Sequence, residues 1–232
     1  MSAFRVEHLS EDCSVWLGDC RDVLPLVGRF DAAVIDPPYG IKEAAGKNAS
    51  RGNLAIAKDY GDDEWDDQTQ EDAVALVVSL SPHSIIFGGN YYSLPPSSCW
   101  LVWDKLNGTN DFADCELAWT NLPKAVRRLQ YRWNGMLRQN NEPRGDHPTQ
   151  KPVGVMRWAI SQLPDSALTI CDAFCGSGTT GVACVELGRG FVGIEQNPKY
   201  FDIACRRISD ALSRPRLPFE EPIKLKQGAL EL

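Results

Sequence analysis

One continuous segment, residues 168–195, constrains the fold of this 232-residue chain more than any other. Its sequence is LTICDAFCGSGTTGVACVELGRGFVGIE, the pattern of a short apolar strand, a glycine-rich turn, a helix and a second strand that ends on an acid. Strands joined by such a crossover helix lie parallel in one sheet. The segment therefore predicts an α/β fold with a mostly parallel, twisted sheet.

The rest of the chain repeats this alternation of short β-rich runs with helical patterns. Strands are expected at residues 14–17, 32–35, 84–87, 100–103, 168–171 and 191–194. Helices are expected at residues 69–80, 153–163, 180–187 and 198–212. Two stretches interrupt the alternation, at residues 41–67 and 106–150. The first is too long for an ordinary connection, so we expect a mobile functional loop or a disordered segment there.

Composition and targeting signals place the chain among ordinary globular proteins. Hydrophobic residues make up 43% and charged residues 24%, which excludes a disordered or collagen-like chain. The apolar runs fall far short of the roughly 18 residues of a membrane span, and the N-terminus lacks the apolar core of a signal peptide. We expect a cytoplasmic chain without membrane contact, whose eight cysteines are free thiols. No C-x-x-C pair occurs and the three histidines are scattered, so no metal site is expected.

The net charge of −7 argues, taken alone, against a nucleic-acid-binding protein. The charge is unevenly distributed, however. Residues 58–72 contain eight acids and one lysine, a local charge of −7. Residues 121–158 contain eight Lys or Arg and two acids, a local charge of +6. The charge of each segment is therefore a better guide to partners than the total.

The glycine-rich turn carries the first functional signal. Gly176, Gly178 and Gly181 satisfy the pattern G-x-G-x-x-G, and Glu195 follows Gly176 by 19 positions. Glycines allow the backbone to approach a ligand closely, and an acid after the second strand can bind two ribose hydroxyls. A nicotinamide dinucleotide and S-adenosylmethionine both present such a ribose, so the turn leaves the cofactor open. Plain packing of helix against strand is a third interpretation.

A second motif, Asp36-Pro37-Pro38-Tyr39, follows the strand expected at 32–35. Two consecutive prolines end the strand and stiffen the backbone. The exocyclic amine of adenine or cytosine is a poor nucleophile because its lone pair is delocalised into the ring. The Asp36 carboxylate and the Pro37 carbonyl can each accept one N–H of this amine, which exposes the lone pair to an electrophilic methyl group. Tyr39 can stack on a base that has left the duplex.

Three motifs, in this order along the chain, resemble those of the β-class, circularly permuted amino-methyltransferases of DNA. They are DPPY at 36–39, HPTQKP at 147–152 and DAFCGSGTT at 172–180. The resemblance covers residues 15 to about 212. It implies a Rossmann-like methyltransferase fold with a permuted motif order and a small inserted target-recognition region. It also implies S-adenosylmethionine as the cofactor and double-stranded DNA as the substrate.

The resemblance predicts an enzyme that transfers a methyl group to the exocyclic N6 of a flipped adenine. An Asp at position 36 resembles the N6-adenine members, whereas N4-cytosine members more often have Ser there. An N4-cytosine DNA methyltransferase on the same scaffold is the first alternative, and a non-catalytic DNA-binding protein with this fold is the second. A nicotinamide dehydrogenase ranks last because it needs neither DPPY nor HPTQKP, and protein or RNA amine acceptors stay open. The family also suggests a homodimer of bacterial or phage origin, and a partner restriction nuclease is an open question.

The resemblance also assigns roles to individual residues. The expected catalytic residues are Asp36, Pro37, Pro38 and Tyr39. The expected cofactor-binding residues are Asp19, Cys20, Asp36, Thr149, Lys151, Phe174, Gly176, Ser177, Gly178, Thr179, Glu195 and Gln196. Asp19 and Cys20, ahead of a helix at 21–26, would read the cofactor's adenine. Thr149 and Lys151 would lie against its methionine end, and Asp36 would also hold its ammonium group.

The basic stretch is expected to bind DNA, because Arg reads guanine edges and phosphates and Asn or Gln reads adenine edges. A solvated basic face is the alternative. The expected DNA-binding residues are Lys124, Arg127, Arg128, Arg132, Arg138, Gln139, Asn140 and Arg144. We expect one methyltransferase domain at 1–212, with a catalytic half at 1–105, a target-recognition region at about 106–146 and a cofactor-binding half at 147–212. An irregular tail at 213–232 follows, and the loop at 41–67 is expected to order over the flipped base.

Overall fold

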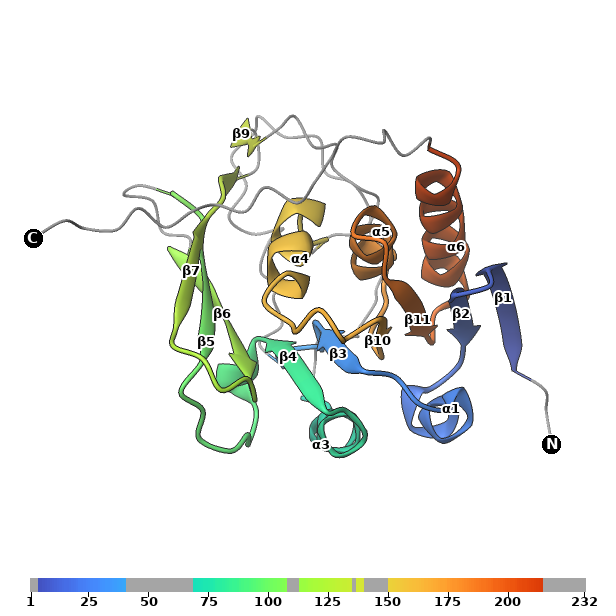
Figure 1. Ribbon diagram of the computed structural model, residues 1–232, viewed down its shortest axis with the longest axis horizontal. Helices are drawn as coiled ribbons and strands as arrows, with labels where there is room; N and C mark the ends of the chain where they lie inside the picture. The colour runs from blue at the N-terminus through green and yellow to red at the C-terminus, as the bar shows by residue number, and fades with distance from the viewer. Residues whose placement is uncertain (1–3, 41–68, 108–112, 135–136, 140–149, 215–232) are drawn as a thin grey trace, which may run out of the picture.

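The computed structural model describes residues 4–40, 69–107, 113–134, 137–139 and 150–214. A mixed sheet with the strand order β1-β2-β11-β10-β3-β4-β6-β5-β7 forms its centre (Figure 1). The strands are β1 (Arg5–Ser10), β2 (Cys13–Leu17), β3 (Ala32–Ile35), β4 (His83–Phe87), β5 (Trp100–Asp104), β6 (Cys115–Thr120), β7 (Arg127–Gln130), β10 (Thr169–Asp172) and β11 (Gly190–Glu195). The five from β2 to β4 run parallel, whereas β1 and β6 run antiparallel to their neighbours. The predicted mostly parallel α/β sheet is therefore confirmed.

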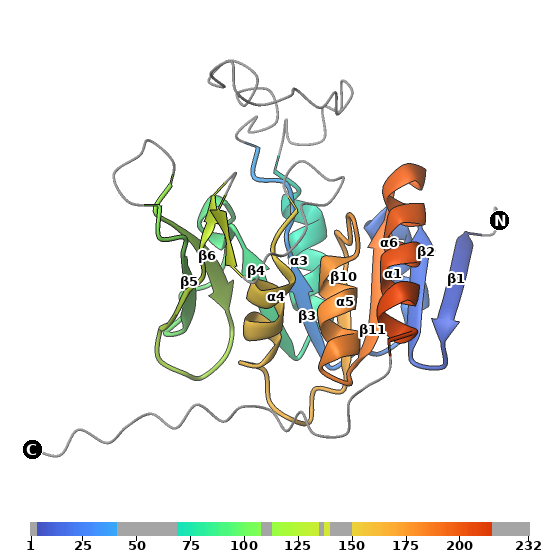
Figure 2. The ribbon, with the colours of Figure 1, turned by 90° about the horizontal axis from the view of Figure 1, so that it is seen from above.

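Helices cover both faces of this sheet. Figures 1 and 2 show α4 (Val153–Ile160), α5 (Thr179–Glu186) and α6 (Pro198–Leu212) on one face. The other face carries α1 (Cys20–Val27) and α3 (Glu71–Leu80). A short turn of 3-10 helix, η1 (Gly89–Tyr91), follows β4, and a hairpin of β8 (Trp133–Asn134) and β9 (Leu137–Arg138) forms a separate two-stranded sheet.

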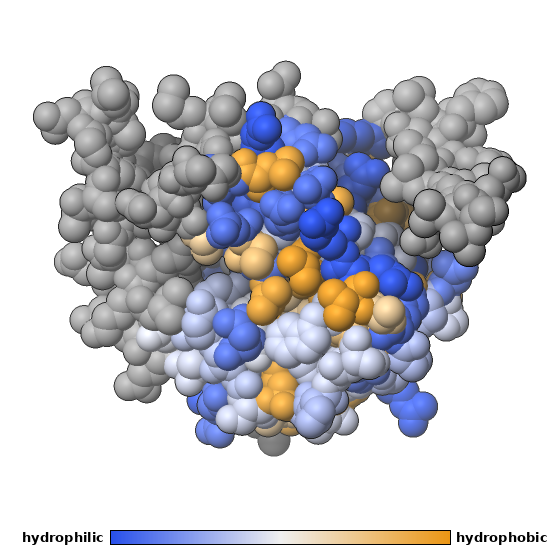
Figure 3. Space-filling model, turned by 90° about the vertical axis from the view of Figure 1, so that its left-hand side faces the viewer, coloured by the Kyte–Doolittle hydropathy of each residue, from blue (hydrophilic) through white to orange (hydrophobic). Residues whose placement is uncertain are grey.

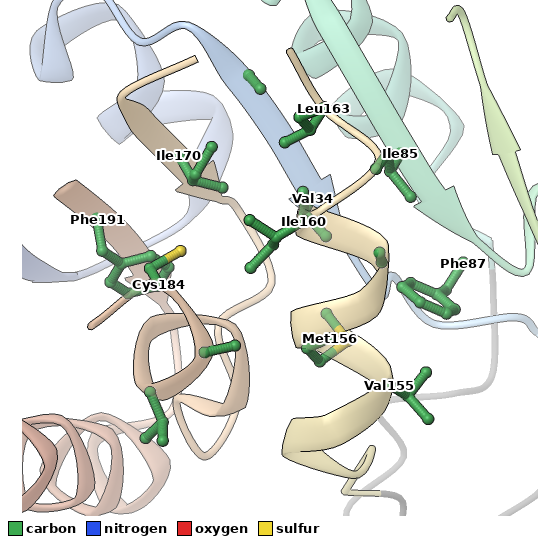
Figure 4. Packing of buried hydrophobic residues seen from close by; sticks show 14 of the residues in the cluster. Val34, Ile85, Phe87, Val155, Met156, Ile160, Leu163, Ile170, Cys184 and Phe191 are labelled. Carbon is green, nitrogen blue, oxygen red and sulfur yellow. The ribbon is translucent and has the colours of Figure 1, made fainter. Parts of the chain in front are cut away.

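Two apolar layers hold these elements together. In the first, Val34 and Ile85 of the sheet lie in one buried cluster with Met156 and Ile160 of α4 (Figure 4). The second lies between the sheet and helices α1 and α3. Each fully buried side chain of this size contributes about 1.5–3 kcal/mol. The side of the molecule at which the sheet ends with β7 has a surface of mixed hydrophilic and hydrophobic residues (Figure 3).

The strand order places a topological switch point between β10 and β3. The crossover through α5 leads from β10 to β11, toward one edge of the sheet, whereas the chain leads from β3 to β4, toward the other edge. The carboxyl ends of β10 and β3 are therefore neighbours from which the two connections diverge. In open α/β sheets, ligands bind in the crevice outside such carboxyl ends. We call this side of the sheet the carboxyl edge.

The structure contains all six expected strands and all four expected helices, with bounds that shift by a few residues. It adds strands that the alternation did not predict. Strand β1 pairs with β2 at one edge. Strands β6 and β7 lie within the stretch 106–150 and belong to the main sheet, so the expected target-recognition region of 106–146 is in part integral to the core. The loop expected at 41–67 lies outside the described residues.

Two other expectations concern the chain as a whole. The eight cysteines are free thiols, as predicted. Burial raises the pKa of Cys171, Cys175 and Cys184, which makes these thiols unreactive. No helix in the described part of the chain combines the length and apolar character needed to cross a bilayer.

Candidate active site

The motif DPPY lies at the carboxyl end of β3, where the structure fixes it from several sides. The Tyr39 hydroxyl donates a hydrogen bond to Asp36 Oδ1 over 2.7 Å. The Tyr92 hydroxyl donates to the Pro38 carbonyl. The Tyr39 ring stacks on Tyr91 of η1, with centroids 5.1 Å apart and an interplanar angle of 19°. Main-chain and ring contacts thus hold the carboxylate and the aromatic ring in one place.

Gly88 makes room for the Tyr39 ring. Its backbone is left-handed, with a φ of 65°. A Cβ at this position would lie 2.0 Å from Tyr39 Cε1. The glycine after β4 is therefore required both by the backbone conformation and by the close approach of the Tyr39 ring.

The ammonium group of Lys151 lies at the centre of the site. Its Nζ is 2.5 Å from Asp36 Oδ1 and 3.0 Å from the Tyr39 hydroxyl oxygen. It is also 3.2 Å from Oε2 of Glu116, a residue of β6. The Lys151 side chain is only 8% exposed. An ammonium this buried requires such partners, and the motif HPTQKP thereby meets DPPY in space.

Glu116 extends this charged cluster away from the switch point. Its Oε1 lies 2.6 Å from Nζ of Lys105. The four charged side chains, two carboxylates and two ammonium groups, alternate in sign along the row Asp36, Lys151, Glu116 and Lys105. Neither Glu116 nor Lys105 belongs to any motif, and the alternating pattern of CELAWT could have indicated the strand but not this role.

These contacts shift the ionisation of the cluster. Burial raises the pKa of Asp36, and the positive charge of Lys151 opposes that rise. Burial alone would also raise the pKa of Glu116, but Lys151 and Lys105 lower it to about 2. Burial disfavours the charged form of Lys151, yet Asp36 and Glu116 outweigh it and raise the lysine's pKa. At neutral pH, Lys151 is therefore an ammonium and Glu116 a carboxylate.

The glycine-rich turn lies at the carboxyl ends of β10 and β11, next to this cluster. Gly176 has a left-handed backbone with a φ of 52°, and its N–H donates to Glu195 Oε2 over 2.7 Å. The N–H of Asn197 donates to Glu195 Oε1, also over 2.7 Å. Burial raises the pKa of Glu195, and these N–H donors oppose the rise. The acid that the spacing singled out is thus fixed beneath the turn.

The other glycines of the turn serve packing. A Cβ on Gly178 would lie 2.9 Å from Cα of Ala204, and one on Gly181 would lie 2.5 Å from Ile208 Cδ1. Both contacts are with α6. The packing interpretation therefore accounts for Gly181 and in part for Gly178, whereas the left-handed backbones of Gly176 and Gly178, with φ of 52° and 80°, shape the turn itself.

Asp172 anchors the start of the turn. Its Oδ1 accepts the Phe174 N–H over 3.0 Å, and its Oδ2 lies 2.5 Å from the Thr180 hydroxyl. Burial raises the pKa of Asp172 to about 7, and the charges of Asp36 and Glu195 add to the rise. The effect of Asp36 shows that the two halves of the site are electrostatically coupled across the switch point.

Arg207 of α6 holds the turn from behind. Its guanidinium donates to the Ser177 carbonyl over 2.6 Å and lies 2.8 Å from the Ser177 hydroxyl. It also lies 3.2 Å from the Thr179 hydroxyl. The Ser177 hydroxyl donates in turn to Gln150 Oε1 over 3.0 Å, which ties the turn to the HPTQKP segment. Nothing in the local sequence around Arg207 distinguishes it from other helix-surface arginines, so its contact with the turn could not be predicted.

The remaining predicted cofactor residues occupy the same edge. Asp19 caps α1 and accepts the Arg21 N–H over 2.9 Å, while its other oxygen pairs with the Arg21 guanidinium. The N–H of Gly18 donates to the Glu195 carbonyl, which places the end of β2 beside the end of β11. Cys20 is buried, Phe174 partly buried and Gln196 exposed. Thr149 lies outside the described residues.

The predicted DNA-binding residues that the structure describes do not form one patch. Lys124 follows β6 at the edge opposite the site, where its Nζ contacts the Gln162 carbonyl. Arg127 and Arg128 are exposed on the outermost strand β7, and Arg128 lines a shallow hollow that also contains Asp104 and Asp114. Arg132 and Gln139 lie beyond the other end of β7, on the carboxyl edge.

Hydrogen bonds join Arg132 and Gln139 across the small hairpin. The Gln139 side-chain oxygen accepts the Arg132 N–H over 3.2 Å, and the Gln139 N–H donates to the Arg132 carbonyl over 3.0 Å. Both side chains belong to exposed residues. The side chain of Arg138, and all of Asn140 and Arg144, lie outside the described structure.

Comparison with known proteins fits this arrangement. Residues 94–206 match a protein-family model described as "DNA methylase". Over 86 residues the chain is 36% identical to the Type II methyltransferase M2.MboI of Moraxella bovis, a match that covers 37% of this chain. It spans 32% of that relative, so about two thirds of the relative's length has no counterpart in the match.

Two solved structures share the fold. The crystal structure of the M1.HpyAVI–SAM complex matches with a TM-score of 0.52 at 22% identity, over 84% of this chain and 98% of that one. The cytosine-N4-specific PvuII DNA methyltransferase matches with a TM-score of 0.50 at 15% identity, over 88% of this chain and 92% of that one. The chain therefore has the α/β fold of these methyltransferases.

Proposed function

We propose that this chain is an S-adenosylmethionine-dependent DNA methyltransferase that methylates the exocyclic N6 of a flipped adenine. The observation that carries the proposal is the meeting of DPPY and the glycine-rich turn at the switch point, where Asp36 and Asp172 end adjacent strands. The match of residues 94–206 to the DNA methylase family supports it, and so does the shared fold. The relatives that match are Type II methyltransferases, which supports a role beside a restriction nuclease.

The residues at the turn suit the cofactor. Glu195 presents a buried carboxylate beneath the left-handed Gly176, and Asp19 presents another from the next strand. Carboxylates are acceptors for ribose hydroxyls and for the adenine amine, and a glycine allows the backbone to approach the ligand. Phe174 adds an aromatic side chain at the same turn. When bound, S-adenosylmethionine supplies an electrophilic methyl group.

Asp36 and its neighbours would act on the target base. The carboxylate accepts one N–H of the amine and the Pro37 carbonyl accepts the other, which turns the lone pair away from the ring and toward the methyl group. As the nitrogen gains positive charge in the transition state, the Asp36 carboxylate stabilises it. Tyr39 stacks on the flipped base, and its hydroxyl orients Asp36.

Lys151 occupies the place that an ammonium of the cofactor was expected to take beside Asp36. The contact supports the expectation that Asp36 serves both substrates, because its carboxylate already binds an ammonium group there. We propose that the contact between Lys151 and Asp36 weakens when the amine of the base or the cofactor's ammonium binds to Asp36.

The N4-cytosine activity is the second candidate, since the PvuII enzyme shares the fold and the same pair of acceptors could bind a cytosine amine. Asp36, where N4-cytosine members more often have Ser, favours adenine. The test is incubation with labelled S-adenosylmethionine and mixed-sequence DNA, followed by nucleoside analysis. We expect label in N6-methyladenine. Label in N4-methylcytosine moves the proposal to the second candidate, and DNA without label refutes both.

The DNA would approach the carboxyl edge, where Arg132 and Gln139 lie. We propose these two, with Arg138, Asn140 and Arg144, as the recognition surface, and we leave Lys124 out because it lies at the opposite edge. A homodimer would enlarge a surface this small. We propose residues 1–212 as one methyltransferase domain with both halves of the site in it.

A further inference from the structure

Glu116 reaches into the proposed site from a strand that carries no motif. It lies on β6 opposite Trp103 of β5, and its side chain is 24% exposed. Its two oxygens contact two different ammonium groups, Lys105 through Oε1 and Lys151 through Oε2. A partly buried carboxylate that touches two lysines is costly to remove, because either cation would lose a partner.

We infer that Glu116 is a positioning residue for methyl transfer, which holds the Lys151 ammonium group against Asp36 and Tyr39. The inference rests on the proposed function, since Asp36 is the residue that would touch the target amine. Glu116 contacts Lys151, which in turn contacts Asp36, and we infer that it acts on the site through the lysine.

The geometry around the ammonium explains the need for Glu116. The Lys151 ammonium donates hydrogen bonds to Asp36 and Tyr39 and forms an ion pair with Glu116, its third oxygen partner. With the third partner gone, the ammonium would be held by DPPY alone. Glu116 therefore shares the positive charge, which leaves the Asp36 carboxylate able to accept an incoming amine.

Two further features keep the cluster in place. Lys105 balances the second carboxylate, so that the row of Asp36, Lys151, Glu116 and Lys105 has no net charge. Aromatic rings support both cations: Lys151 Nζ lies 5.0 Å from the centroid of Phe87, and Lys105 Nζ lies 5.1 Å from that of Trp103. Strands β4, β5 and β6 thus carry Phe87, Trp103 and Glu116, the side chains that support the two cations.

The test replaces Glu116 by Gln, which keeps the shape and removes the charge. We expect kcat for methyl transfer to DNA to fall about tenfold to a hundredfold, the cost of a misplacement of about 1 Å in a catalytic group. The KM for S-adenosylmethionine is expected to change less than kcat, since the Glu116 oxygens contact Lys105 and Lys151 and would affect the cofactor only through Lys151. Asp36 and Glu116 both raise the pKa of Lys151, so the variant should lose the Lys151 proton more easily. As the pH is raised, its activity should therefore fall at a lower pH than that of the wild type.

Glu186→Gln is the matched control. Glu186 lies on α5, and its carboxylate also contacts two cations, Arg157 and Arg214, away from the site. The same substitution there should leave kcat and its pH profile unchanged. Lys105→Met is the second variant: it keeps the Glu116 carboxylate but removes its outer partner, and a smaller fall in kcat is expected.

Three results would overturn the inference while the proposed function stands. Glu116→Gln with wild-type kcat and pH profile would do so. Equal effects of Glu116→Gln in the wild type and in a Lys151→Met background would also do so, because a residue that acts mainly through Lys151 loses most of its effect once Lys151 is gone. A fall in kcat matched by an equal loss in the Glu186→Gln control would indicate a general effect of charge. A wild-type chain that methylates no DNA would refute the proposed function itself, and the inference with it.

Discussion

Lys151 Nζ and Asp36 Oδ1 lie 2.5 Å apart, although 115 positions separate the two residues in the sequence. The contact joins the HPTQKP segment to the DPPY motif directly. It also means that the carboxylate expected to bind a neutral amine is already paired with a cation. The charge at the Asp36 carboxylate therefore depends on residues of both motifs. A change in either motif should affect methyl transfer.

Asp36→Asn tests the central role of this carboxylate. The amide keeps the shape of the side chain but carries no negative charge to stabilise the cationic nitrogen. We expect kcat for DNA methylation to fall by a factor of about 100 or more, as for the loss of other groups that stabilise developing charge. Steady-state assays with labelled cofactor would measure it.

Asp202→Asn provides the control for that experiment. Asp202 lies on α6 and pairs with Arg5 at the surface, with 60% of its side chain exposed. This substitution should leave kcat unchanged. An Asp36→Asn variant that keeps more than a tenth of wild-type kcat would contradict the role of Asp36.

Asp172 should make the protein less stable as the pH rises. The pKa of Asp172 is about 7 in the folded chain, above its ordinary value of 3.8. Between these values the unfolded chain loses the proton while the folded chain keeps it. The stabilisation that protonated Asp172 contributes is therefore complete below about pH 4 and is lost by about pH 7. A shift of this size corresponds to on the order of 4 kcal/mol.

Asp172→Asn should remove that pH dependence. The amide can still accept the Phe174 N–H and bond the Thr180 hydroxyl, the two contacts of the native side chain. Urea unfolding of the cofactor-free chain from pH 4 to pH 7.5 would show a smaller slope for the variant than for the wild type. Parallel curves for the two proteins would mean that Asp172 is ionised in the folded state at neutral pH.

Gly88→Ala should disturb the site through Tyr39. The left-handed backbone costs any other residue about 1–2 kcal/mol, and the new Cβ would collide with the Tyr39 ring. Gly28 also has a positive φ, of 85°, but its ψ of −148° lies outside the left-handed helical region, and nothing lies within 4 Å of its missing Cβ. Gly28→Ala should therefore lose stability in thermal unfolding through its backbone alone and keep methyl transfer, whereas Gly88→Ala should lose both stability and methyl transfer.

The sequence could predict those parts of the site that depend on local pattern. The turn at Gly176, the acid at Glu195 and the motif at Asp36 each follow a short apolar strand, and parallel strands bring their carboxyl ends to one edge. Glu116 was beyond such reasoning. Its partners Lys105 and Lys151 lie 11 and 35 positions away, and only the antiparallel pairing of β6 with β4 and β5 brings the three together.

The basic stretch shows a second limit of sequence reasoning. A count of +6 over residues 121–158 suggests one positive surface. Strand β7 crosses the sheet between Lys124 and Arg132, however, and each strand residue advances the chain by about 3.3 Å. The cations therefore separate to opposite edges, which the linear charge does not reveal.

Arg207→Met should weaken cofactor binding without a change in the chemical step. The guanidinium contacts the backbone and hydroxyl of Ser177, so its loss frees the glycine-rich turn. Hydrogen bonds from a charged donor contribute about 1.5–3 kcal/mol, which corresponds to a Kd for S-adenosylmethionine at least about tenfold higher. Calorimetric titration would measure the Kd, and kcat at saturating cofactor should stay close to the wild-type value. Arg206→Met, an exposed neighbour on the same helix, should change neither quantity.

Arg132→Ala and Lys124→Ala distinguish the two edges of the sheet as DNA surfaces. Each variant loses one positive charge, but Arg132 lies on the carboxyl edge with the site, and Lys124 contacts the Gln162 carbonyl at the opposite edge. If DNA approaches the carboxyl edge, Arg132→Ala should weaken binding and reduce the salt dependence of the affinity by about one released counterion. Lys124→Ala should leave both unchanged. Fluorescence anisotropy with a labelled duplex over a range of salt concentrations would measure these slopes, and equal losses in the two variants would place the DNA across β7 instead.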